Sequence, residues 1–150
     1  MQYLRAVSLL LAASLLLADD GANARYVGGT VGAIPAEADG RIRTTDELFL
    51  EFRCSKRQIN VAYDHINLVE YGLNVNRRVA LAVAISPLFM LSKSRQHFLT
   101  IGYADKDGKQ QAMVFRVEKS KIRSVLVSLE ARTGLKVQYQ DDEARKAGKG

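Results

Sequence analysis

Short segments in which apolar and polar residues alternate recur along this sequence, and turn-forming residues separate them. In residues 48–53, for example, Leu48, Leu50 and Phe52 share one face at a period of two. Residues 59–63 and 113–117 alternate in the same way. Further expected strands are residues 26–32, 41–44 and 66–71, the stretch 98–103 that is rich in β-branched and aromatic residues, and a last short strand at 135–139. Such alternation is typical of half-buried strands, and a series of them predicts an all-β domain.

One segment near the end of the chain has a helical period instead. Ile122, Val125, Leu126 and Leu129 stand at positions i, i+3, i+4 and i+7 and form an apolar stripe. Gly134 predicts the end of this helix, because glycine readily adopts the left-handed conformation that ends many helices. The sequence thus predicts a mainly β fold, a small antiparallel barrel or two packed sheets of about seven strands. One C-terminal amphipathic helix is expected to close it.

The first 24 residues have the three parts of a secretory signal peptide. Arg5 gives a positively charged start, residues 6–18 are apolar apart from two serines, and Ala22, Asn23 and Ala24 form a small-residue cleavage site. A retained membrane anchor is the weaker interpretation, because a span needs roughly 20 apolar residues and this run is shorter. We therefore expect export, either periplasmic or secreted, and a mature chain that begins at Arg25.

The mature chain is expected to form one domain over residues 25–139. Residues 140–150 are a polar tail that we expect to fray. Cys54 is the only cysteine of the chain, so no internal disulfide can form, and we expect it to be a small, partly buried residue at a strand end.

Residues 77–95 interrupt the strand pattern with an apolar insert. The run from Val79 to Leu91 is apolar apart from Ser86 and Pro87, and cationic residues bracket it on both sides. Three interpretations stay open: the insert is part of the core, it dips into a bilayer, or it packs against a second copy or another envelope protein. A run of about thirteen residues is too short to span a bilayer but suits shallow insertion.

The insert supplies the predicted contact with a membrane or a partner. Cations near an anionic bilayer contribute about 1 kcal/mol each, and the apolar residues after the proline are the candidates for the inserted tip. The predicted contact residues are Arg77, Arg78, Leu88, Phe89, Met90, Leu91, Lys93 and Arg95.

The charge balance narrows the class of partner. The chain has a net charge of +6, which favours anionic lipid headgroups, envelope polyanions or acidic envelope proteins. An exported protein does not meet cytoplasmic nucleic acid, so no nucleic-acid partner is expected. Self-association into a homo-oligomer is an open alternative, with the insert buried as core or as a dimer contact.

No catalytic, cofactor or metal motif is predicted. Gly28, Gly29 and Gly32 lack the strand-to-helix context of a phosphate loop, and Asp107-Gly108 indicates a hairpin turn rather than a calcium loop. His65 and His97 are far apart in sequence, and neither has an evident acid partner. An enzyme of unknown class is therefore the less favoured alternative to a binding module.

Two stretches and the closing helix resemble the pleckstrin-homology-like superfamily, in particular its GRAM-related bacterial members. The stretches are I-N-V-A-Y-D-H-I-N-L-V-E-Y-G at residues 59–72 and H-F-L-T-I-G-Y at residues 97–103, and the resemblance runs from about Tyr26 to Gly134. It implies a non-catalytic module that binds lipids, peptides or proteins. Members that bind phosphoinositides use a basic loop between the first two strands, whereas residues 33–40 here contain no Lys or Arg. Phosphoinositide binding is therefore not expected.

Overall fold

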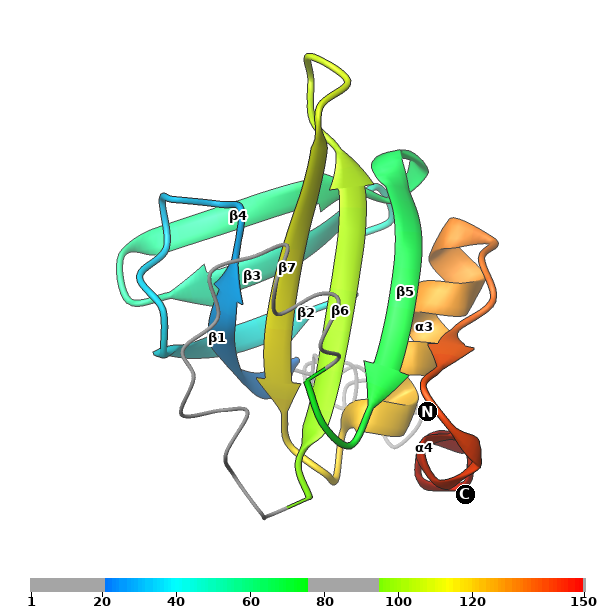
Figure 1. The fold of residues 1–150 in the computed structure, drawn as a ribbon. Coiled ribbons are helices and arrows are strands. Elements are labelled where there is room, and N and C mark those ends of the chain that lie inside the picture. Colours follow the sequence, from blue (N-terminus) through cyan, green and yellow to red (C-terminus); the bar gives the residue numbers. More distant parts are fainter. Residues whose placement is uncertain (1–20, 76–94, 150) are drawn as a thin grey trace, which may run out of the picture.

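A computed structural model describes residues 21–75 and 95–149 of the chain (Figure 1). Within these residues strands are the most common element, and two α-helices follow near the C-terminus. The elements in chain order are β1 (Ala22–Gly29), β2 (Ala38–Arg43), β3 (Phe49–Cys54), β4 (Arg57–Ala62), the 3₁₀ helix η2 (Tyr63–His65), β5 (Ile66–Gly72), β6 (His97–Ala104), β7 (Gln110–Val117), α3 (Ile122–Thr133), β8 (Gln138–Tyr139) and α4 (Asp142–Lys149).

The strands form one sheet in the order β4-β3-β2-β1-β7-β6-β5-β8. All neighbouring pairs are antiparallel except β5 and β8. Strands β4 and β5 stand far apart in this order although only η2 joins them, so the sheet must curl back on itself. Figure 1 shows the result: β2, β3 and β4 run across the direction of β5, β6 and β7. The predicted mainly β fold is confirmed. The two halves of the curled sheet pack against each other, and the sheet does not close into a barrel.

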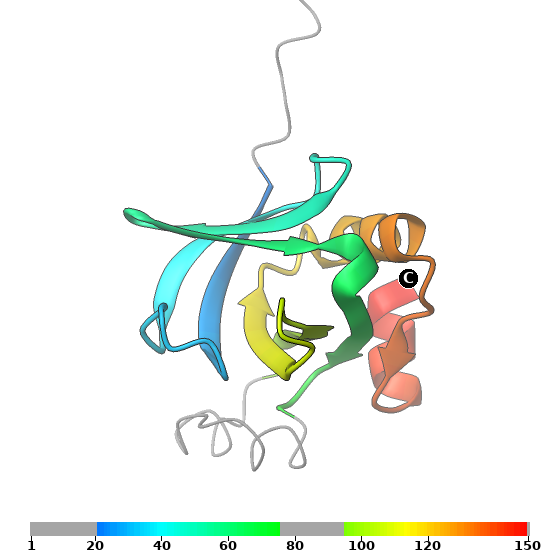
Figure 2. The same ribbon diagram turned by 90° about the horizontal axis from the view of Figure 1, so that it is seen from above.

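The core lies inside the curl and beneath α3. Strand residues at alternate positions point inward, and the aromatic rings of Tyr26, Phe52 and Phe115 meet there with centroids 4.8–6.3 Å apart. The predicted stripe of α3 is buried against this core. Gly134 has φ 72° and ends α3 as predicted, because few side chains tolerate that conformation. Figure 2 shows α3 lying along one side of the sheet.

Two local predictions hold as well. The hairpin between β6 and β7 turns at Gly108, where φ is 76°, and the Asp105 carboxylate accepts hydrogen bonds from the backbone N–H groups of Asp107 and Lys109. Cys54 is a buried thiol at the end of β3. One inward placement is wrong: Leu48 is 67% exposed, because β3 begins one residue later and an Asp46 turn precedes it.

The folded domain begins before Arg25, which corrects the expected boundary. Strand β1 starts at Ala22, and the side chains of Ala22 and Ala24 are 1% and 5% exposed. Ala22 pairs with Ile42 of β2, and Ala24 pairs with both Gly40 of β2 and Val117 of β7. The small residues that resemble a cleavage site therefore also serve as inward-facing residues of a central strand.

The expectation of a fraying tail is also wrong, because α4 packs against the domain. Ala144 is fully buried, and its backbone N–H donates to the Asp141 carboxylate over 2.7 Å. Gly148 lies so close to the rings of Tyr71 and Tyr139 that a Cβ atom would stand 2.6 Å from Tyr139. Two small residues thus let a polar helix approach the sheet, although the segment has no long apolar stripe.

Candidate functional site

Most of the predicted contact residues lie outside the part of the chain that the structure describes. These are Arg77, Arg78, Leu88, Phe89, Met90, Leu91 and Lys93. Arg95 is described: its side chain is 70% exposed and forms an ion pair with Glu143 of α4. The core, membrane and self-association interpretations of the insert therefore all stay open.

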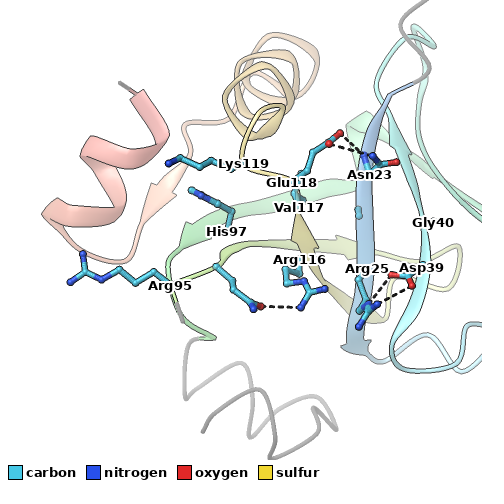
Figure 3. Close-up of a pocket in the computed structure, with 12 residues that line it drawn as sticks. Asn23, Arg25, Asp39, Gly40, Arg95, His97, Arg116, Val117, Glu118 and Lys119 are labelled. Atoms are coloured by element: carbon cyan, nitrogen blue, oxygen red, sulfur yellow. Dashed lines mark hydrogen bonds and ion pairs between the residues drawn. The ribbon is translucent and has the colours of Figure 1, made fainter. Parts of the chain in front are cut away.

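Arg95 lies at the rim of a groove of about 510 Å³ that cationic residues dominate (Figure 3). We call it the cationic groove. Its cations come from strand β1, from the approach to β6, and from β7 and the turn that follows β7. The lining residues are Asn23, Ala24, Arg25, Asp39, Gly40, Arg95, Gln96, His97, Arg116, Val117, Glu118 and Lys119.

The register of the sheet brings these residues together. Arg25 of β1 stands directly opposite Arg116 of β7, and His97 at the start of β6 stands opposite Val117 at the end of β7. The chain then continues into Lys119, so its ammonium group lies beside the β6 terminus. Residues far apart in sequence thus share one end of three adjacent strands.

Arg25 already has an anionic partner in the groove. Its guanidinium group forms a bidentate ion pair with Asp39, with N···O distances of 2.7 and 2.9 Å. Hydrogen bonding by Arg25 holds the pKa of the Asp39 carboxyl below its usual value. Glu118 is also engaged, because its carboxylate accepts hydrogen bonds from the backbone N–H and the side-chain amide of Asn23 at 2.8 and 3.3 Å.

Arg116 and Lys119 form no such ion pair among the described residues, although the charge of Arg116 also helps to lower the pKa of Asp39. Arg116 donates to the Gln96 side chain over 3.2 Å, which is a neutral partner (Figure 3). In the part of the chain that the structure describes, Arg116 has no ion-pair partner, and Lys119 has neither an ion pair nor a hydrogen bond. Two cations are therefore available to an anionic ligand in the groove.

His97 adds a neutral donor to the groove. The Tyr71 hydroxyl lies 2.5 Å from His97 Nδ1, and the two rings stack with centroids 5.9 Å apart. Burial raises the pKa of Tyr71 to about 12, so this hydroxyl stays protonated near neutral pH and can donate a hydrogen bond to the imidazole. Burial, with a smaller effect of Lys119, lowers the pKa of His97 below its usual value. In the neutral tautomer that accepts this hydrogen bond at Nδ1, the ring carries its hydrogen on Nε2.

A second hollow extends the cationic surface toward the helices. It has a volume of about 690 Å³ and shares His97 and Lys119 with the groove. Arg123 of α3 lies on its wall and donates to the backbone carbonyl of Ala147 in α4 over 3.3 Å. The positive surface thus continues from β1 across β7 to the start of α3.

The groove can bind an anion, since its walls offer guanidinium, ammonium and imidazole donors. Phosphate, sulfate and carboxylate groups accept such hydrogen bonds, and charge assistance strengthens them. Among the described residues, no group of three or more His, Cys, Asp and Glu side chains could hold a metal ion. The described helices are also too short or too polar to cross a membrane.

Of the groove cations, the predicted contact residues include Arg95 and do not include Arg25, Arg116 or Lys119. Arg25 and Arg116 are outward-facing positions of ordinary alternating strands, and their pairing depends on the non-consecutive neighbours β1 and β7. A local sequence pattern does not contain that pairing.

Comparison of the chain with protein-family models and with curated proteins finds no match. The resemblance to the pleckstrin-homology-like superfamily therefore stays a prediction.

Proposed function

We propose that this protein is a non-catalytic, exported binding module that contacts an anionic membrane surface through the cationic groove and residues 77–95. The observation that carries the proposal is the pair Arg116 and Lys119, cations that share a groove and have no carboxylate partner in the described chain. An anionic headgroup in the groove would compensate both charges.

The charge of the groove supports an anionic ligand over a cationic or apolar one. Arg25, Arg95, Arg116 and Lys119 line it, against the carboxylates of Asp39 and Glu118. Both carboxylates already accept hydrogen bonds from groove residues. A cationic ligand would find few acceptors there, whereas an anionic ligand would find guanidinium and ammonium donors.

The position of Arg95 links the groove to the apolar insert. Arg95 is the last residue of the predicted insert and lines the groove, so its main chain ties the two together. Apolar residues and cations that meet a bilayer together combine shallow insertion with attraction to headgroups. The proposal therefore places the cationic groove and the apolar insert on one contact face.

Co-sedimentation with vesicles tests this function. The full chain is mixed at low salt with phosphatidylglycerol-containing vesicles and with pure phosphatidylcholine vesicles. We expect binding to the anionic vesicles, and the double variant Arg116→Gln/Lys119→Gln should bind them about tenfold to thirtyfold more weakly, because each cation contributes about 1 kcal/mol at such a surface.

Lys106→Gln is the matched control, because Lys106 is an exposed lysine in the β6–β7 hairpin, at the other end of these strands from the groove. It removes one charge but should retain binding. Equal binding of the parent chain to neutral and anionic vesicles, or none to either, would show that the proposed function is wrong.

A further inference from the structure

A second cluster of arginines lies on the outer face of β2 and β3. Arg41, Arg43 and Arg53 line a hollow of about 380 Å³ together with Gly40 and Ser55. We call it the arginine hollow. It has no counterpart in the sequence predictions, which placed cationic contacts only in residues 77–95.

The register places two of these arginines at directly opposite backbone positions. Arg41 of β2 stands directly opposite Arg53 of β3. Like charges at directly opposite positions destabilise an antiparallel pair unless something compensates them. Arg25 and Arg116 in the cationic groove form a second directly opposed arginine pair on the same sheet.

The local carboxylates do not compensate the hollow. Arg43 and Arg53 share Glu51, at N···O distances of 3.5 and 3.4 Å. Within residues 21–75 and 95–149, Arg41 donates only to the backbone carbonyl of Gly21, over 3.5 Å. The Nε atom of Arg43 is buried with no hydrogen-bond partner in the described chain. Two of the three guanidinium groups thus share one carboxylate, Arg41 has no carboxylate partner among the described residues, and the buried Arg43 Nε donor has no acceptor there.

The arginine hollow adjoins the cationic groove on the same face of the sheet. Gly40 lines both. Asp39 and Arg41 of β2 stand opposite Arg25 and Asn23 of β1, so Arg25 and Arg41 point to the same side. Strand β7 with Arg116 and strand β3 with Arg53 are three strand intervals apart, each of about 4.8 Å. A single small anion cannot reach across that distance.

We propose that the arginine hollow is a second anion-binding site, which together with the cationic groove takes successive phosphate groups of a linear polyanion. This inference rests on the proposed function, because it uses the same cationic groove, and it names linear polyphosphates as a further class of ligand. Phosphate is favoured because guanidinium groups bind it in bidentate geometry. A flexible chain can follow a curled sheet from the groove to the hollow, whereas a flat bilayer touches such a curved face over a smaller area.

Binding of short-chain inorganic polyphosphate tests the inference, with inorganic orthophosphate as the single-anion comparison. The full chain should bind polyphosphate far more tightly than orthophosphate. Arg41→Gln/Arg53→Gln should weaken polyphosphate binding about tenfold or more. It should also reduce the slope of log K against log salt by roughly 1.4, as expected when two contacts to a single-stranded polyanion are lost.

The control Lys106→Gln/Lys109→Gln removes two charges from the β6–β7 hairpin and should leave affinity and slope nearly unchanged. The single variant Arg41→Gln changes an exposed residue and replaces the double variant if that variant does not fold. It should reduce the slope by about half as much as the double variant. An Arg41→Gln/Arg53→Gln chain that folds and binds polyphosphate like the parent chain overturns the inference.

Vesicle binding separates this inference from the proposed function. If the parent chain binds polyphosphate through both sites but ignores anionic vesicles, the membrane function is wrong and the second site stands. If Arg41→Gln/Arg53→Gln binds both vesicles and polyphosphate like the parent chain, the second site is wrong and the membrane function stands.

Discussion

At the scale of single residues, the contact between His97 and Tyr71 connects the groove to the core. Tyr71 is fully buried, and its hydroxyl holds the imidazole ring at the groove wall. The stacked rings and this contact hold His97 in place at the groove wall, and burial favours its neutral form.

The lowered pKa of His97 predicts a dependence of stability on pH. Above about pH 7 the ring is neutral in both the folded and the unfolded chain, so it contributes no pH dependence. As the pH falls through 6.5, the unfolded chain takes up a proton first, because burial lowers the pKa of His97 in the folded state. The free energy of unfolding therefore falls until the pH lies below the folded pKa.

His97→Gln removes this part of the pH dependence. Urea unfolding of the parent chain and the variant, near pH 7.5 and near pH 5.5, measures it. The parent chain should lose more stability than the variant between the two conditions. The same loss in both proteins would mean that His97 titrates alike in the folded and unfolded chains.

At the scale of elements, β1 is the strand on which both halves of the sheet depend. It pairs with β2 on one side and β7 on the other, and it carries Arg25 on its outer face. Its first residues are held by Glu118, which accepts from Asn23 and donates its own backbone N–H to the Asn23 carbonyl over 3.0 Å. The start of β1 is therefore part of the folded domain.

Removal of these residues should destabilise the protein. The free energy of unfolding of a chain of residues 25–150 should be about 3 kcal/mol lower than that of a chain of residues 21–150. The shorter chain lacks two buried alanines and several strand hydrogen bonds. The urea midpoints of the two chains measure the difference. If a leader is removed on export, the intact mass should show that Ala22, Asn23 and Ala24 remain. Equal midpoints, or a mass that begins at Arg25, would contradict this account of β1.

The sequence predicts the elements much better than it predicts the site. Alternation located β3, β4 and β7, β-branched and aromatic residues located β6, and the stripe from Ile122 to Leu129 located α3, because these patterns are local. Helix α4 was missed because Ala144 and Gly148 bury little apolar surface and fit only against Tyr71 and Tyr139. The groove was missed because it depends on which strands become neighbours after the sheet curls.

At the scale of the whole molecule, the curled sheet separates apolar and cationic residues. Aromatic and aliphatic side chains fill the inside, and arginines collect on the outer face and at one end of β1, β7 and β6. Strand β5 ends and strand β6 begins at that same end (Figure 1), and the apolar insert lies between these two strands in the sequence. The hairpin between β6 and β7 marks the opposite end. The molecule thus has one end suited to an anionic surface.

The emission of a single tryptophan in the insert tests this account most directly. The chain contains no tryptophan, so Phe89→Trp introduces a unique probe at a predicted contact residue outside the described part of the chain. With phosphatidylglycerol-containing vesicles at low salt, the emission should shift to shorter wavelength as the indole leaves water. The shift should weaken when Arg116→Gln/Lys119→Gln is added. A folded Phe89→Trp chain whose emission is the same with and without anionic vesicles would contradict the account.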